Sequence, residues 1–228
     1  MDTAELERPV LAVDVVLFGI HDRKLKVLLH TRQKEPFRDA PALPGVAVRV
    51  DETLETAARR AVYEKTDWKQ EDSDNLFLEQ LAAFDALYRD PRGRTISLAF
   101  MGIVRTMPEE KQGMIWKDCR EIAEGSLPFD HGMIVKTAVQ RLRGKLRYTN
   151  IAKGFLPETF RIEELQNVYE IIMEYSLNRA NFRNRLLKLG MIEQVTVLTE
   201  AVGKKGGRPP HLYRFTRDLI EMTERDFL

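Results

Sequence analysis

The stretch that decides the fold runs from Leu43 to Thr66 and reads LPGVAVRVDETLETAARRAVYEKT. It opens with a Pro-Gly turn, after which residues 46–50 predict a short strand. From Thr53 to Lys65 the apolar residues recur at helical spacing, so an amphipathic helix is expected. Its apolar face comprises Leu54, Ala57, Ala58, Ala61 and Val62. A glycine turn, a strand and a helix therefore follow one another within this single stretch.

The stretch resembles the Nudix box: a glycine, five residues, Glu, seven residues, then Arg-Glu-apolar-x-Glu-Glu-x-Gly. The helix of that box presents carboxylates that hold Mg²⁺ against a nucleotide pyrophosphate. Aligned on Glu52 and Arg60, its three glutamate positions hold Ala61, Glu64 and Lys65. An ammonium within about 4 Å of the ion opposes its binding by several kcal/mol. We therefore expect no metal, no cofactor and no hydrolysis at this helix.

Two more positions of the box depart from the pattern. The first glycine falls on Val46, one residue after Gly45, and the last falls on Asp67. Arg60 and Glu64, four residues apart on the helix, are expected to pair with each other. An amphipathic helix that never carried a box is the alternative, but the matching spacing and the preceding turn favour a degenerate box.

The rest of the first 150 residues is rich in strand patterns. A polar turn at 19–24 separates the first two and predicts a β-hairpin, and the turn sequence 90–94 separates the next two. Asp130 is expected to cap a helix that ends near Leu146. The strand patterns cover 10–18, 25–30, 76–84 and 95–104.

The pattern changes near residue 150, which predicts two domains, 1–150 and 151–228. Two helices, 162–174 and 179–189, are followed by strands at 192–198 and 211–215. Helix, turn, helix and a β-hairpin with a basic, glycine-rich tip is the order of a winged helix-turn-helix. The fold class expected for the whole chain is α+β: a Nudix-like α/β/α sandwich with a mixed sheet, followed by this winged helix.

Charge is unevenly distributed along the 228 residues, although the net charge is +1. Residues 179–217 hold nine basic and two acidic residues, a net charge of +7, whereas the segments on either side each carry −3. A basic helix and a basic hairpin tip in one small domain favour DNA binding over a solvated charged surface.

The second helix is expected to lie in the DNA major groove, where Asn can bind adenine and Arg guanine. Its apolar face, Phe182, Leu186 and Leu189, should pack in the core. The hairpin tip should contact phosphate or the minor groove. The residues expected to contact DNA are Arg179, Asn181, Arg183, Asn184 and Lys188 on the helix, and Lys204, Lys205 and Arg208 at the tip.

Cysteine content and hydropathy indicate the compartment. A single cysteine, Cys119, excludes an intrachain disulfide and fits a reducing environment. No apolar run is long enough to span a membrane, and the first residues are acidic where a signal peptide would be basic. The four histidines lack the spacing of a zinc site. A cytoplasmic protein without a membrane partner is therefore expected.

With both parts in view, the chain resembles the NrtR family of Nudix-related transcriptional regulators over nearly its full length. The resemblance rests on segments 60–66, 88–94, 129–131, 178–183 and 207–213. It implies a homodimer that binds palindromic operator DNA, usually represses NAD or sugar-utilisation genes, and responds to an effector such as ADP-ribose or a sugar derivative. The residues expected at the effector site are Arg32, Arg60, Glu64, Arg89, Arg92 and Arg94.

Two other functions remain open at this point. One is an active Nudix hydrolase of a nucleoside diphosphate derivative whose C-terminal part serves dimerisation. The other is an inactive metabolite-binding module that contacts protein instead of DNA. Four arginines have their own alternative, because they can equally be ordinary charged residues of hairpin loops. These are Arg32, Arg89, Arg92 and Arg94.

Overall fold

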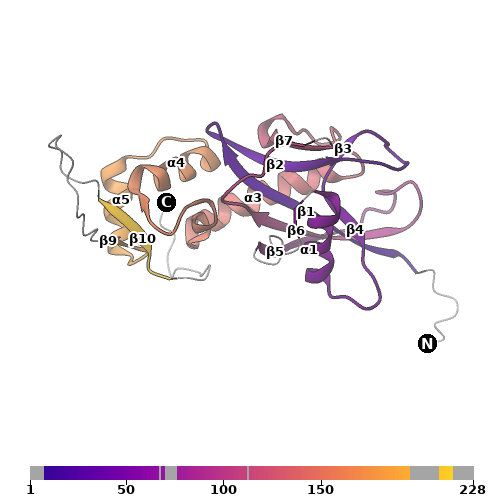
Figure 1. Ribbon diagram of the computed structural model, residues 1–228, viewed down its shortest axis with the longest axis horizontal. Coiled ribbons are helices and arrows are strands. Elements are labelled where there is room, and N and C mark those ends of the chain that lie inside the picture. Colours follow the sequence, from indigo (N-terminus) through magenta and orange to yellow (C-terminus); the bar gives the residue numbers. More distant parts are fainter. Residues whose placement is uncertain (1–7, 67, 70–75, 112, 196–210, 218–228) are drawn as a thin grey trace. The chain divides into compact units, whose positions relative to one another are not determined.

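The computed structural model describes residues 8–66, 68–69, 76–111, 113–195 and 211–217 (Figure 1). The chain separates into two compact units, Met1–Gln140 and Arg141–Leu228, which we call unit 1 and unit 2. The division falls within one helix, ten residues before the domain boundary expected from the sequence. We describe each unit by itself.

Unit 1 is built on a seven-stranded mixed sheet of order β3-β2-β1-β6-β5, in which β4 also pairs with β1 and β7 with β2. Strands β1 and β6 are parallel, from Val10 opposite Thr95 to Phe18 opposite Ile103, and the other pairs are antiparallel. The mixed sheet expected from the sequence is thus confirmed. The strands are β1 (Val10–His21), β2 (Lys24–Thr31), β3 (Pro41–Ala42), β4 (Gly45–Ala47), β5 (Phe77–Phe84), β6 (Thr95–Ile103) and β7 (Met114–Asp118).

The expected first hairpin is present, but its turn is shorter than the predicted segment 19–24. Residues 19–21 continue β1, and only Asp22 and Arg23 form the turn. Both have positive φ, 50° and 56°, as a two-residue hairpin turn that matches the strand twist requires. The sequence predicts a longer turn because residues 19–24 include a glycine and four polar residues.

Helix α1 (Leu54–Lys65) ends where the sequence predicts and begins one residue after the predicted start. Thr53 caps it by accepting a hydrogen bond from the amide of Thr56. Its small apolar residues are fully buried against Val13, Val15 and Leu17, which alternate along one face of β1. Val46 packs against the same cluster. The buried residues of the α1 face are Ala57, Ala58, Ala61 and Val62.

The first part of a second helix, up to Gln140, completes unit 1. Helix α3 (His131–Tyr148) follows the short 3₁₀ turn η2 (Cys119–Glu121) and buries Ile134, Val135 and Ala138. In Figure 1 it lies behind the sheet, whereas α1 lies in front. The expected helix between Asp130 and about Leu146 is therefore confirmed, and the α/β/α layering follows from the two helices.

Unit 2 has the element order of a winged helix. A short 3₁₀ turn and a first strand precede two helices, and the three strands form a sheet of order β8-β10-β9. The expected strand 192–198 is described only to residue 195. The elements are η3 (Ile151–Phe155), β8 (Phe160–Arg161), α4 (Ile162–Met173), α5 (Arg179–Lys188), β9 (Ile192–Val195) and β10 (Leu212–Phe215).

Candidate effector site and DNA-recognition helix

The helix of the box is fixed by one buried arginine. Arg60 donates from Nε and Nη2 to the two carboxylate oxygens of Glu52, at 2.9 and 2.5 Å, and from Nη2 to the carbonyl of Ala47 at 2.8 Å. Its Nη1 lies 3.3 Å from both oxygens of Glu64, so the expected pair is confirmed. The hydrogen bonds from Arg60 lower the pKa of Glu52 to about 2. Glu52 is therefore ionised, and both carboxylates of the box are paired with Arg60.

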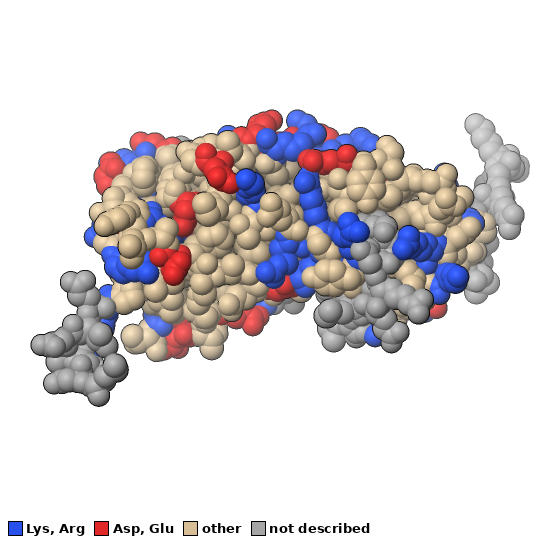
Figure 2. Space-filling model, turned by 180° about the vertical axis from the view of Figure 1, so that it is seen from behind, with Lys and Arg blue, Asp and Glu red and all other residues tan. Residues whose placement is uncertain are grey.

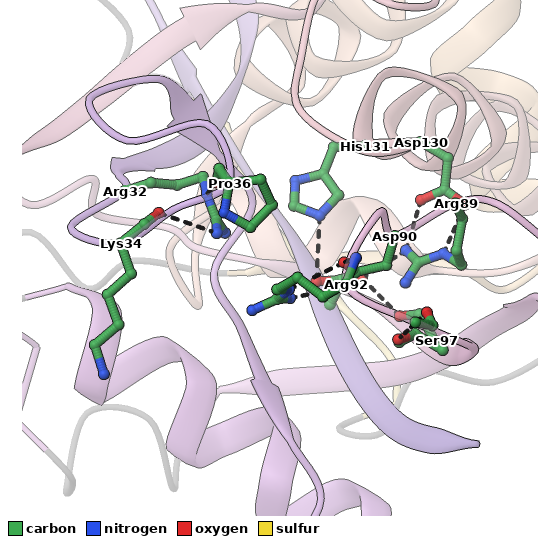
Figure 3. A network of polar contacts seen from close by, with 12 residues as sticks. Arg32, Lys34, Pro36, Arg89, Asp90, Arg92, Ser97, Asp130 and His131 are labelled. Carbon is green, nitrogen blue, oxygen red and sulfur yellow. Dashed lines mark hydrogen bonds and ion pairs between the residues drawn. The ribbon is translucent and has the colours of Figure 1, made fainter. Parts of the chain in front are cut away.

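A buried polar network joins β1 to the start of α3 (Figure 3). The Asp14 carboxylate accepts from Ser97 Oγ at 2.6 Å and from Arg89 Nη2 at 3.2 Å, and lies 3.4 Å from His131 Nε2. Burial raises the pKa of Asp14, but these three partners outweigh it and lower the value to about 2. His131 Nδ1 accepts from the amide of Leu43 at 3.0 Å, so Nε2 carries the proton that faces Asp14.

Two arginines meet over one aromatic ring beside this network. The guanidinium of Arg32 lies 4.7 Å from the ring centre of Phe129, and that of Arg92 lies 5.7 Å from it. Phe37, 43% exposed, contacts Phe129 edge-on at 5.1 Å. Burial lowers the pKa of Arg32, and the positive charge of Arg92 lowers it further. Arg92 is ion-paired with Asp90, to which its Nη2 donates at 2.6 Å, whereas the described partners of the Arg32 guanidinium include the carbonyl of Pro36 at 2.9 Å. A guanidinium that is not neutralised by this pair lies beside exposed aromatic surface, which favours an anionic, ring-containing ligand.

His30 and Lys65 lie on the α1 side of the sheet. His30 is two residues beyond Leu28 on β2, and Leu28 packs in the cluster beneath α1. Burial lowers the pKa of His30 to about 4, and the charges of Lys65 and Arg32 act in the same direction. His30 is therefore neutral at pH 7, and the neighbouring charges that lower its pKa include those of Lys65 and Arg32.

Helix α5 in unit 2 presents a polar surface that the core does not use. Asn178 caps the helix by accepting from the amide of Asn181 at 3.0 Å. Phe182 and Leu186 are buried, as expected, but Leu189 is 36% exposed, so its assignment to the core was wrong. The helix ends at Lys188, Leu189 is its C-cap residue, and Gly190 turns the chain away with φ of 65°.

The residues of α5 expected to contact DNA are exposed or half-buried. Arg179 pairs with Glu163 of α4, and Arg183 donates to Asn184 Oδ1 at 2.9 Å. On the face shown in Figure 2, groups of Lys and Arg side chains gather over unit 2 with few acidic side chains among them. Of the α5 residues expected to contact DNA, the half-buried one is Arg183, and the exposed ones are Arg179, Asn181, Asn184 and Lys188. Lys204, Lys205 and Arg208, expected at the hairpin tip, lie outside the described residues.

Two family models match the chain, one in each part. Residues 8–132 match the NUDIX domain, and residues 153–215 match the NrtR DNA-binding winged helix domain. The chain belongs to the NrtR family. The fold expected from the sequence, a Nudix domain followed by a winged helix, is confirmed, and this pairing of domains is that of a transcriptional regulator. No helix in the described part of the chain is long and apolar enough to cross a membrane.

Three proteins illustrate what this NrtR-family chain is similar to. An ADPR responsive transcriptional repressor NtrR of Acinetobacter baylyi is 32% identical over 214 residues, covering 91% of this chain and 82% of the relative. An ADP-ribose pyrophosphatase of Methanocaldococcus jannaschii is 34% identical over 131 residues, covering 56% of this chain and 72% of that protein.

Solved structures of the third protein, Shewanella oneidensis NrtR, resemble this chain in both parts. Its complex with a 27mer DNA is 27% identical with a TM-score of 0.73, covering 95% of this chain and 98% of that one. Its NUDIX domain complexed with ADP ribose is 29% identical with a TM-score of 0.53, covering 62% of this chain and 94% of that one. This chain is thus similar to one structure that contains DNA and to another that contains ADP-ribose.

The effector-site residues expected from the sequence fall into separate groups in this NrtR-family chain. Arg32 and Arg92 meet at Phe129, whereas Arg60 and Glu64 pair with each other on α1. Arg94 donates to the carbonyls of residues 85 and 86, at 2.7 and 3.3 Å, and so holds its own loop. Arg89 is buried in the polar network.

The sequence does not predict the roles of three side chains at the site. Asp14 and His131 belong to the buried polar network, and Phe129 lies against Arg32 and Arg92. A signal existed for Asp14, because it is the one charged residue in the apolar run 10–18. Phe129 and His131 belong to a segment already noted for its family resemblance, but its sequence does not reveal that Phe129 lies beneath two arginines.

Proposed function

We propose that this chain is a transcriptional repressor that binds a palindromic operator as a homodimer and releases it when ADP-ribose binds to unit 1. The observation that carries the proposal is the coexistence, in one NrtR-family chain, of the polar surface of α5 and the cationic cluster at Phe129. A relative with 32% identity is named as an ADPR responsive repressor, which supports the same combination. A DNA-binding role also agrees with the expected cytoplasmic location.

For the effector we propose direct contacts from Arg32 and Arg92. ADP-ribose consists of two riboses joined by a diphosphate, and one ribose carries an adenine ring. A site for it therefore needs cations and an aromatic surface close together. Arg32, Arg92, Phe129 and Phe37 supply both. The remaining residues expected at this site would hold the surrounding backbone and α1 in place. They are Arg60, Glu64, Arg89 and Arg94.

For DNA we propose that α5 enters the major groove, with the tip residues Lys204, Lys205 and Arg208 on phosphate or in the minor groove. Arg183 and Asn184 would read base edges, since their side chains lie together on the exposed surface. Arg179, Asn181 and Lys188 would contact the backbone.

We also propose that unit 1 does not hydrolyse its ligand. The Nudix fold implies Mg²⁺, but the donor set of this chain does not suit the ion: Glu52 and Glu64 are paired with arginines and position 61 is a buried alanine. Within the described residues, no group of three His, Cys, Asp or Glu side chains could hold a metal.

Selection from random duplex DNA, followed by fluorescence anisotropy on the selected sequence, tests the function. We expect a palindrome bound in the nanomolar range at moderate salt, and weaker binding when ADP-ribose is added. Replacing Arg183 by Ala should weaken specific binding by about 1–3 kcal/mol. Lys136→Ala removes an exposed charge from α3 and serves as the control. Failure to select any sequence would contradict the proposal.

The hydrolase alternative has its own support, because an ADP-ribose pyrophosphatase is among the relatives. Its test is Mg²⁺-dependent release of AMP from ADP-ribose, with Glu64→Gln as the inactive variant. We expect no turnover above the uncatalysed rate. Turnover by the unmodified chain that disappears in Glu64→Gln would contradict our assignment.

A further inference from the structure

The turn between α4 and α5 comprises residues 174–178, all of which are exposed except the half-buried Leu177. Its first residue, Glu174, ends α4 in the left-handed conformation with φ of 61°. The amide of Glu174 donates to the carbonyl of Glu170 at 2.9 Å. An exposed turn gains little from apolar burial, so its conformation depends on polar contacts such as this one.

Two side chains of α4 hold the far end of this turn. Glu170 Oε1 accepts from the amide of Leu177 at 2.8 Å, and Gln166 Nε2 donates to the carbonyl of Leu177 at 2.9 Å. Gln166 also donates to Glu170 at 2.8 Å. Leu177 directly precedes Asn178, the cap of α5. The start of α5 is therefore tied to α4 through both backbone polar groups of one residue.

Arg143 holds the near end of the same turn from a different helix. It lies on the part of α3 that belongs to unit 2, between the fully buried Leu142 and Leu146. Its Nε donates to the carbonyl of Ile172 at 2.8 Å, and its Nη2 lies 2.7 Å from Glu174 Oε2. The carbonyl of Ile172 belongs to the last turn of α4, where helix carbonyls lack partners within the helix. One planar guanidinium thus joins the end of α4 and the first residue of the turn to α3.

The direction of α5 depends on this turn. Tyr169 of α4 packs edge-on against Phe182 of α5, with 5.0 Å between the ring centres. This buried contact holds the two helices together, but it does not fix their angle, because apolar attraction is non-directional. Hydrogen bonds are directional. The polar contacts at the two ends of the turn therefore set the angle at which α5 leaves α4.

We propose that Arg143 is a positioning residue for DNA recognition: its grip on the end of α4 and on the turn sets the orientation of α5 that base-specific binding requires. This inference rests on the proposed function, because it needs α5 to be the recognition helix. Groups that bind base edges must be placed to within about 0.5 Å. Contacts to phosphate carry no sequence information. Loss of Arg143 should therefore reduce specific binding and largely spare nonspecific binding.

Fluorescence anisotropy of the full-length chain, on its selected operator and on a scrambled duplex of equal length, tests this inference. Arg143→Met should weaken operator binding about tenfold and change the affinity for the scrambled duplex by less than about threefold. Arg143→Lys keeps the charge but loses the planar pair of donors, so it should weaken operator binding at least about threefold. Hydrogen exchange at the amides of residues 174–181 should rise in both variants.

Two comparisons separate the orientation of α5 from the loss of a positive charge, which weakens binding to every sequence. Arg143→Met combined with Glu174→Gln leaves the net charge of the chain unchanged and should still weaken operator binding about tenfold. Lys136→Met breaks an exposed ion pair with Glu124 on the first part of α3 and should bind both duplexes within about twofold of the unmodified chain.

Thermal unfolding without DNA sets the temperature at which the variants are compared, so that every chain is folded. If Arg143→Met unfolds too early for this, Arg143→Lys decides by the same ratio of operator affinity to scrambled-duplex affinity. A fall in that ratio supports the positioning role, because loss of stability alone would not change it in a folded chain.

Three results would contradict the inference. If Arg143→Met lost affinity equally for both duplexes, the charge and not the orientation of α5 would be responsible. If Arg143→Lys bound the operator as tightly as the unmodified chain, the two-point contact would have no role. Both results leave the proposed function standing, whereas failure of the unmodified chain to select any duplex overturns the proposed function and the role of Arg143 together.

Discussion

Arg89 and Asp130, 41 residues apart in the sequence, form a two-pronged ion pair in the interior of unit 1. Arg89 Nε lies 2.8 Å from Asp130 Oδ2, and Arg89 Nη2 lies 2.5 Å from Asp130 Oδ1. The same Nη2 reaches Asp14 Oδ2 at 3.2 Å. One guanidinium thus holds the loop before β6, the start of α3 and the middle of β1 (Figure 3). The cluster at Phe129 depends on this contact, because Phe129 directly precedes Asp130.

Replacing Arg89 by Met should destabilise the protein strongly. The side chain is 4% exposed, and its loss leaves two acidic side chains without their counter-ion. Removing one partner of a buried pair costs about 3–5 kcal/mol, and urea unfolding followed by circular dichroism measures it. Arg94→Met is the control, because that guanidinium, in the same loop, binds only backbone carbonyls among the contacts described. A loss below about 1 kcal/mol for Arg89→Met would contradict the buried role.

Gly45→Ala should also destabilise unit 1, for a steric reason. A Cβ at this position would lie 2.2 Å from Asp14 Oδ1 and 3.0 Å from the carbonyl oxygen of Val13. The backbone of β1 is fixed by its neighbours, so we expect a cost of about 1–3 kcal/mol. Gly144→Ala on α3 is the matched control: nothing lies within 4 Å of its Cβ, and alanine there should add up to about 1 kcal/mol. Equal stabilities of the two variants would refute the close approach.

Local patterns in the sequence are sufficient to predict most elements of both units. Helix α1 and the helices of unit 2 have apolar residues at helical spacing, with Thr53 and Asn178 as recognisable caps. Strand β7 was missed because it follows a long irregular segment and is stabilised by pairing with β2, about 85 residues earlier, rather than by its own pattern.

The sequence predicts which arginines belong to the candidate site, but not which of them are buried or what they contact. Arg89 and Arg92 are three residues apart in the same loop, yet Arg89 is buried in its ion pairs, whereas Arg92 is exposed, pairs with Asp90 and lies over Phe129. That difference depends on where α3 begins relative to the loop. No local pattern contains this information.

His30 should make the stability of unit 1 sensitive to pH. Its pKa is about 4 in the folded chain and 6.5 without the surrounding protein. Between these values the unfolded chain binds a proton that the folded chain does not, so the free energy of unfolding should fall as pH drops. The full loss is about 3 kcal/mol between pH 7 and pH 4.

Urea unfolding at several pH values measures this loss, with His30→Gln expected to flatten the profile between pH 7 and pH 4. His21→Gln is the control, because its side chain is 62% exposed at the hairpin turn. Asp14 and Asp118 have a pKa lowered to about 2, so they stabilise the fold above pH 4 and lose their contribution only below it. A profile unaffected by His30→Gln would show that the imidazole is not buried neutral.

The cap of α5 should link the stability of unit 2 to DNA affinity. Asn178 Oδ1 accepts from the Asn181 amide at 3.0 Å, and its loss in Asn178→Ala should cost about 1 kcal/mol. Hydrogen exchange at the amides of the first helical turn should then rise, because this turn opens more often. Operator affinity should fall as well, since the exposed residues of that turn would be ordered only on binding.

Asn178→Ser and Asn178→Asp separate the cap from the charge at this position. Both side chains cap a helix, so both should restore slow hydrogen exchange. Serine should also restore operator affinity, whereas aspartate places a negative charge near the phosphates and should weaken binding most at low salt. If Asn178→Asp bound the operator as tightly as Asn178→Ser, the start of α5 would not face DNA, and the recognition surface would have to be sought elsewhere in unit 2.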